Sequence, residues 1–160
     1  MFVSNTSTLI LLAKITLFYK FIENSPKIVI PKEVRKEYLG KESFETALIE
    51  KEIEKGNIKV AENPNLRNNL TEQFHLDKGE AEAYNLFKQD KYEALLTDDG
   101  ELIKLCKLEQ IPFICALAIV LRLYEKGAIK KEEALEKMDN LVKVGRYKKE
   151  IYEYYKGEVK

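Results

Sequence analysis

Asp98 and Asp99 form a pair of adjacent carboxylates directly after an apolar stretch, residues 92–97, that we predict to be a buried strand. Side chains just past the carboxyl end of such a strand point into the crevice where open α/β sheets bind their ligands. Carboxylate oxygens are the donors that a hard divalent cation prefers. The pair therefore marks a candidate functional site that could hold such a cation.

The amino terminus has the same arrangement with an amide in place of the acids. Residues 1–3 read as a strand, residues 4–8 read as the polar turn after it, and Asn5 is the residue that leaves the strand. An amide oxygen can coordinate a hard cation, although it brings no charge. Asn5 can equally bond the local backbone of a turn, so both interpretations stay open.

The composition is that of a folded domain in a reducing compartment. A chain of 160 residues with 45% apolar residues can bury a real core as one domain. Lys and Arg number 27, as do Asp and Glu, so net charge neither favours nor excludes nucleic acid. Cys106, Cys115 and the single His75 lack the spacing of zinc ligands. The apolar run at 9–22 contains lysines and is too short to span a bilayer, so we expect a cytoplasmic protein that does not enter membranes.

Predicted strands and helices alternate along the chain. The predicted strands are residues 1–4, 27–30, 58–60, 92–97 and 112–114; the predicted helices are residues 8–23 with a break near 14–16, a helix opened by Pro31, and residues 42–55, 66–74, 77–90, 102–108, 116–126, 130–143 and 147–156, with a loop at 62–65. Such alternation indicates an α/β domain whose mainly parallel sheet is covered by helices on both faces.

Four short segments, in this order and approximate spacing, resemble those of the PIN-domain ribonucleases. They are VSNTSTLI at 3–10, IPKEVRKE at 30–37, GEAEA at 79–83 and LLTDD at 95–99. No one segment is specific, but the ordered set extends the resemblance over nearly the whole chain. The sequence looks like the small prokaryotic branch, often the toxin of a toxin–antitoxin pair. The resemblance implies one PIN-like domain over residues 1–160, a three-layer α/β/α fold with a central, mainly parallel sheet.

The resemblance also implies a metal site for Mg²⁺ or Mn²⁺. The family places an acid after the first strand, a glutamate on the helix after the second strand, an acid at the start of a middle helix and an aspartate after the next strand. The matching positions are Asn5, Glu37, Glu80 and Asp98 or Asp99, which the resemblance makes the catalytic and metal-binding residues. Ser7 matches the family's hydroxyl beside the first acid. Asn5 departs from the pattern, because the resemblance leads us to expect aspartate there.

Each of these acids also has a structural interpretation. Asp77 and Glu80 have the spacing of a capping box, in which the glutamate reaches back to a backbone N–H. Asp98 or Asp99 can cap the helix that follows Gly100. Glu37 alone would be an ordinary acid on a helix surface.

Candidate substrate contacts lie near the carboxyl terminus. Arg146 and Lys148 flank an aromatic residue and could grip the phosphates of RNA while that residue stacks a base. Tyrosines at helical spacing in this region could instead dock the last helix onto the body. Arg35 is an alternative phosphate contact. The run at 9–22 is apolar nearly all round, which predicts burial on more than one side, as in a homodimer.

Three hypotheses follow for the function. The first is a metal-dependent endoribonuclease that hydrolyses RNA phosphodiesters, acts as a toxin with an antitoxin protein as partner, and is weakened by Asn5. The second is a catalytically degenerate PIN-like module that binds RNA or a protein partner. The third is an unrelated small α/β interaction domain with helix-capping acids.

Overall fold

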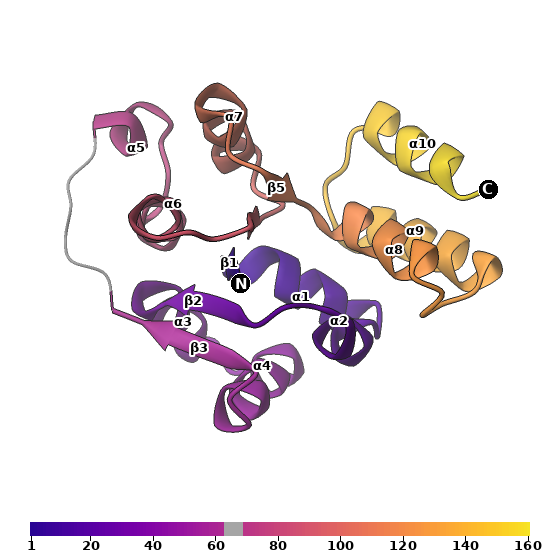
Figure 1. The fold of residues 1–160 in the computed structure, drawn as a ribbon, viewed down its shortest axis with the longest axis horizontal. Helices are drawn as coiled ribbons and strands as arrows, with labels where there is room; N and C mark the ends of the chain where they lie inside the picture. Colours follow the sequence, from indigo (N-terminus) through magenta and orange to yellow (C-terminus); the bar gives the residue numbers. More distant parts are fainter. Residues whose placement is uncertain (63–68) are drawn as a thin grey trace.

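A computed structural model, which describes residues 1–62 and 69–160, contains a five-stranded sheet in which all paired strands are parallel (Figure 1). The strand order is β3-β2-β1-β4-β5. The strands are β1 (Phe2–Ser4), β2 (Ile28–Pro31), β3 (Ile58–Ala61), β4 (Ala94–Leu96) and β5 (Phe113–Ile114). The order reverses at β1, between β2 on one side and β4 on the other. Open α/β sheets bind their ligands at the carboxyl ends of the strands next to such a reversal.

The register of β1 and β4 sets the position of the predicted site. Ser4 pairs with Leu96 in the parallel ladder, so the next residues, Asn5 and Thr97, leave the sheet side by side. The backbone N–H of Asn5 donates to the Leu96 carbonyl at 3.3 Å. Two segments that lie far apart in the sequence therefore begin their loops at the same point.

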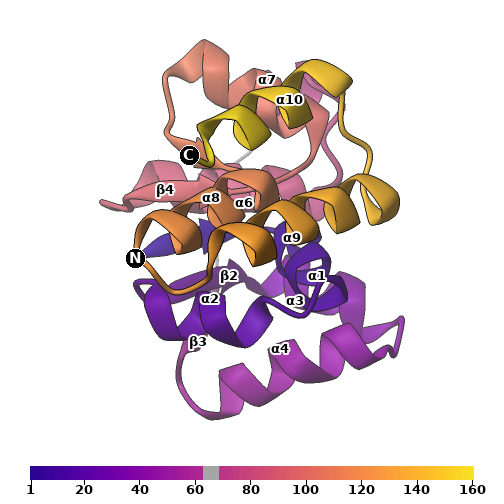
Figure 2. The same cartoon turned by 90° about the vertical axis from the view of Figure 1, so that its right-hand side faces the viewer.

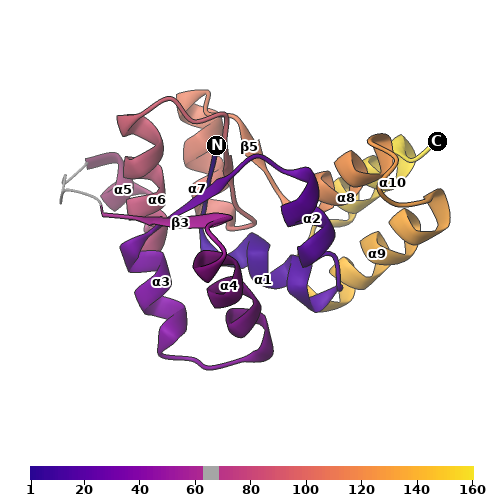
Figure 3. The same cartoon turned by 60° about the horizontal axis from the view of Figure 1, so that its bottom comes forward.

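Helices cover both faces of the sheet. They are α1 (Thr6–Lys14), α2 (Phe18–Asn24), α3 (Lys32–Leu39), α4 (Phe44–Glu54), α5 (Asn69–Gln73), α6 (Lys78–Gln89), α7 (Gly100–Glu109), α8 (Ala116–Glu125), α9 (Lys131–Val144) and α10 (Lys149–Glu158). Figure 3 shows α8, α9 and α10 gathered at one end of the molecule and α3, α5 and α6 at the other. The predicted three-layer α/β/α class is confirmed, and the sheet is wholly parallel in the described residues.

Alternation along the strands divides the core between the two layers. Val3 and Val29 pack with side chains of α6 on one face, whereas Phe2, Ile28 and Ile30 pack with α1, α2 and α8 on the other. Successive side chains of a strand point to opposite faces, so two to four residues per strand are enough to serve both layers.

The apolar run at 9–22 is mostly buried within this one chain. It forms α1 and α2, separated at the predicted break, where Thr16 has a φ of 64°. Its buried side chains belong to the larger core cluster, together with residues of α4 and α8. Contacts inside the chain thus account for most of the burial that suggested a homodimer, and the homodimer stays a prediction.

Differences from the predicted elements are mainly at their ends. The last helix begins at Lys149 rather than Tyr147, so Tyr147 lies between α9 and α10. The predicted loop at 63–65 and the predicted start of a helix at 66–68 lie outside the described residues. Within the described part of the chain, no helix combines the length and apolar character that a membrane span requires.

Candidate active site

A cleft near the carboxyl ends of β1 and β4 brings together several of the predicted site residues. It is lined by Ser7, Ile10, Leu11, Glu80, Asp98, Asp99, Arg146 and Tyr147. These residues come from α1, from the start of α6, from the loop between β4 and α7, and from the segment between α9 and α10. The fold therefore collects Ser7, three of the predicted acids and one predicted phosphate contact at one place.

Asn5 is buried at the end of β1 and fixed by hydrogen bonds from both sides. Its side chain donates through Nδ2 to Thr97 Oγ1 at 2.9 Å and accepts at Oδ1 from the Ser7 hydroxyl at 2.8 Å. Ser7 in turn accepts from the backbone N–H of Asp98 at 3.2 Å. Asn5 thus ties the end of β1 to the end of β4, beside the acidic cleft.

Asp98 is surrounded by donors from three other parts of the chain. Its Oδ2 accepts from the Thr8 hydroxyl at 2.6 Å and from the Ala116 N–H at 3.0 Å. Its Oδ1 accepts from the Tyr147 hydroxyl at 2.6 Å and from the same Ala116 N–H at 3.2 Å. Burial raises the pKa of this carboxyl, although the donors partly oppose the shift. Each oxygen of Asp98 therefore already has two hydrogen-bond contacts.

Asp99 caps α7 and keeps one oxygen uncommitted. Its Oδ2 accepts from the Leu102 N–H at 2.8 Å, and its own N–H donates to Thr97 Oγ1 at 3.0 Å. Oδ1 takes part in no hydrogen bond with the residues that the structure describes. The capping interpretation is confirmed for Asp99, and it leaves this oxygen available to a ligand.

Glu80 has a similar double role at the start of α6. It forms the predicted capping box with Asp77, whose N–H donates to Glu80 Oε2 at 2.9 Å. Its Oε1 is without a hydrogen bond in the described parts of the chain. Burial, reinforced by the negative charges of Asp77 and Asp99, raises the pKa of Glu80 to about 8. Glu80 and Asp99 therefore repel each other when both are ionised.

Glu37 lies next to this cleft and is not among the residues that line it. Its Oε1 accepts from the Gly79 N–H at 2.8 Å, one residue before Glu80. A Cβ atom at Gly79 would lie 2.6 Å from Glu37 Oε2, which is closer than real Cβ contacts. Burial and the charges of Asp77 and Glu33 raise the pKa of Glu37. Glu37 thus joins α3 to the first turn of α6, and Gly79 makes room for it.

Replacing Gly79 by alanine is expected to destabilise the chain by about 1 kcal/mol, because the new methyl group displaces the Glu37 carboxylate and weakens its hydrogen bond with the Gly79 N–H. In a Glu37→Ala background the same substitution should cost much less. Urea unfolding of the four chains of this double-mutant cycle measures the difference. Gly100→Ala is the control, since a Cβ at Gly100 meets nothing within 4 Å. Equal costs in both backgrounds would contradict the packing described here.

The predicted substrate contacts occupy different places. Arg146 lines the cleft and forms no ion pair with a described residue. Arg35 donates from Nε and Nη2 to the two oxygens of Glu50, at 2.9 and 2.8 Å, so its guanidinium is already paired. Lys148 immediately precedes α10, is exposed, and does not line the cleft. Only Arg146 of the three stands where a phosphate would meet the acids.

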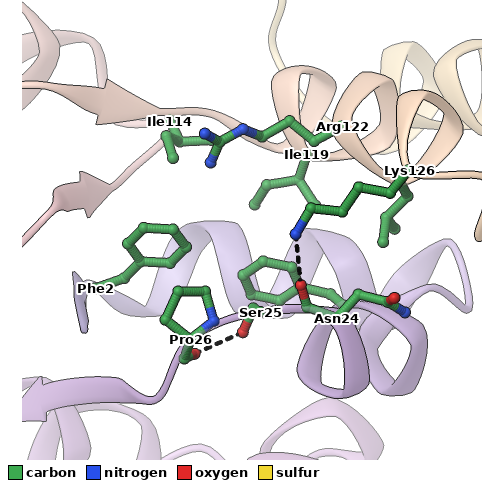
Figure 4. A pocket seen from close by; sticks show the side chains of 10 residues that line it. Phe2, Asn24, Ser25, Pro26, Ile114, Ile119, Arg122 and Lys126 are labelled. Carbon is green, nitrogen blue, oxygen red and sulfur yellow. Dashed lines mark hydrogen bonds between the residues drawn. The ribbon is translucent and has the colours of Figure 1, made fainter.

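Two other hollows differ from the cleft in their chemistry. One lies between α2 and α8 and has a mainly apolar lining with no acid; at its rim Lys126 donates to the Asn24 carbonyl at 2.9 Å (Figure 4). The other lies along α3 and α4, where Glu50 is occupied by Arg35 and the Tyr38 hydroxyl. Among the described residues, neither hollow places two uncommitted carboxylates from different elements together, so the cleft is the stronger candidate.

The acids of the cleft fit a divalent cation as a pair. Among the described residues no three Asp, Glu, His or Cys side chains are close enough to form a metal-binding group. However, Mg²⁺ is commonly held by one or two carboxylates and completes its shell with water and substrate phosphates. The uncommitted oxygens of Glu80 and Asp99 meet that requirement. Asp98 would meet it only after losing one of its present donors.

The stability of the chain should fall as the pH rises from about 5 to about 8. The pKa of Glu80 is about 8 in the folded chain and about 4.3 in an unfolded one, so the folded state binds the extra proton in this range. The raised pKa values of Glu37 and Asp98 act in the same direction. Free energies of unfolding at several pH values should fall less steeply for Glu80→Gln than for the unchanged chain. Glu101→Gln, which alters an acid paired with Lys104, should keep the original slope; an unchanged slope in Glu80→Gln would refute the assignment.

Three residues form hydrogen bonds with the predicted site members that the sequence does not predict; of these, Tyr147 is predicted only to stack a base or to dock the last helix. Thr8 and Tyr147 donate to Asp98, and Thr97 links Asn5 to Asp99. Thr97 could have been noticed as the hydroxyl next to the acid pair. No comparable sequence signal connects Thr8 or Tyr147 with Asp98, because those contacts depend on how α1 and the α9–α10 segment pack.

The fold and the cleft define a nuclease-like α/β domain. A family model described as a PIN domain matches residues 1–158, and the chain belongs to this family. PIN domains generally use divalent metal ions and commonly bind RNA. Searches of curated proteins and of solved structures find no significant match.

Proposed function

We propose that this chain is an endoribonuclease that hydrolyses RNA phosphodiesters with Mg²⁺ or Mn²⁺. The observation that supports it most is the pair Glu80 and Asp99, which come from different elements and leave one oxygen each uncommitted at the same cleft. The effect of Asp99 on the pKa of Glu80 agrees with that proximity. A cation held by Glu80 and Asp99 would offset the repulsion between their two carboxylates.

The residues of the cleft have distinct parts in this proposal. A bound divalent cation would stabilise negative charge that develops on the phosphate oxygens during hydrolysis. Glu80 and Asp99 would hold it, while Asn5 and Ser7 keep the ends of β1 and β4 together. Arg146 would contact a phosphate of the bound RNA, whose binding is favoured by release of counterions. Arg35, Lys148 and Glu37 remain predicted contributors.

A second candidate is a PIN-like module that binds RNA or a protein partner without cleaving. The observation in its favour is Asn5, an uncharged side chain whose amide oxygen and nitrogen are both hydrogen-bonded within the chain. Asp98 is likewise satisfied by its own neighbours. A toxin role, an antitoxin partner and a homodimer belong to the first proposal as its predicted setting.

Cleavage of a labelled single-stranded RNA distinguishes the two candidates. The nuclease proposal predicts cleavage with Mn²⁺, none with excess chelator, and loss of cleavage in Glu80→Gln. Glu101→Gln, prepared in the same way, should cleave like the unchanged chain and exclude a contaminating nuclease. RNA binding without cleavage in any metal would favour the binding module.

A further inference from the structure

Tyr147 closes the cleft from the carboxyl-terminal side. It lies in the short segment between α9 and α10, and its hydroxyl donates to Asp98 Oδ1 at 2.6 Å. Its ring packs against Gly145, where a Cβ atom would come within 2.6 Å of Tyr147 Cε2. The absence of a side chain at Gly145 therefore allows the ring to turn back toward the acids.

The Tyr147 hydroxyl occupies a position on Asp98 that is thereby closed to other ligands of the cleft. A carboxylate offers about four lone-pair sites on its two oxygens. In Asp98 these sites receive Thr8, Tyr147 and a shared contact from the Ala116 N–H. Because Tyr147 and Asp98 both line the cleft, departure of the Tyr147 hydroxyl would free a position on Oδ1 for another ligand there.

The segment that carries Tyr147 is attached to the body through partly buried tyrosines and the buried Val159. α10 lies over α8 and α9 (Figure 2), and none of its side chains is fully buried. Lys148 precedes it without a side-chain capping bond. Its attachments are mostly partly exposed, such as Tyr152 to Asp139, with Val159 as a buried anchor. Elements with few buried apolar contacts open locally at low free-energy cost.

We propose that residues 145–160, the C-terminal arm, are autoinhibitory, with Tyr147 blocking Asp98 until the arm opens. In the closed state the cleft offers a cation Glu80 and Asp99. In the open state Asp98 Oδ1 loses the Tyr147 donor and becomes available to a ligand of the same cleft, such as a water molecule of the cation's shell. This inference rests on the proposed function, because it concerns access of a divalent cation to the same acids.

A Mn²⁺ titration of thermal stability tests the arm directly. Tyr147→Phe removes the hydroxyl and keeps the ring, so the Mn²⁺ concentration for half of the maximal shift in Tm should fall about tenfold, the equivalent of one hydrogen bond to a charged group. The control Tyr154→Phe, which alters an exposed tyrosine of the same arm, should leave that concentration unchanged. An unchanged or higher Mn²⁺ requirement in Tyr147→Phe would overturn the proposal.

Hydrogen exchange on the unchanged chain provides a second readout that needs no substitution. Saturating Mn²⁺ should speed the exchange of backbone amides at 145–160 and slow that at the start of α6. Faster amide exchange at residues 145–160 in Mn²⁺, with no cleavage of RNA, would support the autoinhibitory role of the arm and refute the nuclease proposal. If the chain binds Mn²⁺ and cleaves RNA but amide exchange in the arm does not change, the autoinhibitory role is refuted and the nuclease proposal is retained. No Mn²⁺ response in either the unchanged chain or Tyr147→Phe would refute the arm.

Discussion

Asn5→Asp is expected to raise Mn²⁺-dependent RNA cleavage by about 100-fold or more, which corresponds to roughly 2.7 kcal/mol of the barrier. An aspartate at this position would add a negative charge beside the cleft and attract the cation, whereas the present amide is uncharged and its oxygen accepts from Ser7. Initial rates of cleavage of a labelled RNA, measured for both chains at matched Mn²⁺ concentrations, give the ratio.

The same substitution should lower stability when no metal is present. Asn5 is only 4% exposed and stands beside Asp98, so aspartate there adds a buried negative charge. Ser7 can keep donating to it, but Thr97 loses the amide N–H that it now accepts. Tm should therefore fall in chelator and recover with Mn²⁺. A folded Asn5→Asp chain that gains neither activity nor a metal response would leave the binding module as the better account.

Asp98→Ala is expected to destabilise the chain by about 3 kcal/mol or more, because it leaves three donors without their acceptor, two of them on fully buried residues, at a cost of roughly 1–3 kcal/mol for each buried donor. Those donors are the Thr8 hydroxyl, the Ala116 N–H and the Tyr147 hydroxyl. Asp99→Ala removes one helix cap and should cost only about 1 kcal/mol.

Urea unfolding of the two variants separates the roles of the adjacent acids. Asp99→Ala should stay folded and lose Mn²⁺-dependent cleavage, since it removes a ligand of the pair while sparing the scaffold. Asp98→Ala should unfold at a clearly lower urea concentration than the unchanged chain, whether or not it cleaves RNA. Equal losses of stability would mean that the hydrogen bonds around Asp98 do not hold α1, α8 and the C-terminal arm together.

The layers of the fold could be predicted because their cause is local. In β1, Phe2 and Ser4 face one side and Val3 the other, and the short apolar strands alternate with helical segments throughout the described chain. Once β1 and β4 are neighbours, their parallel register brings Asn5 beside Thr97. Both predicted caps, at Asp77 with Glu80 and at Asp99, also depend on residues within one turn.

The state of each carboxylate could not be predicted, because its partners come from distant segments. Thr8 and Tyr147 are 90 and 49 residues from Asp98 in the sequence. Their hydroxyls reach it only after α1 and the segment before α10 have packed. Which oxygens stay available to a cation therefore follows from tertiary packing, whereas the acids themselves are visible in the sequence.

The apolar run at 9–22 illustrates the same limit for the core. A helix that is apolar nearly all round must be covered on several sides, but periodicity does not say whether a second copy or the same chain covers it. Here α4, α8 and the sheet supply most of that cover. A homodimer would therefore need surfaces other than the buried part of this run.

The most direct test of the central claim is the position of Mn²⁺ in crystals soaked with that ion, read from its anomalous scattering. The account predicts a peak in the cleft within coordination distance of both Glu80 and Asp99, and loss of that peak in Glu80→Gln crystals soaked in the same way. A peak elsewhere, or an empty cleft at a Mn²⁺ concentration that supports RNA cleavage, would contradict it.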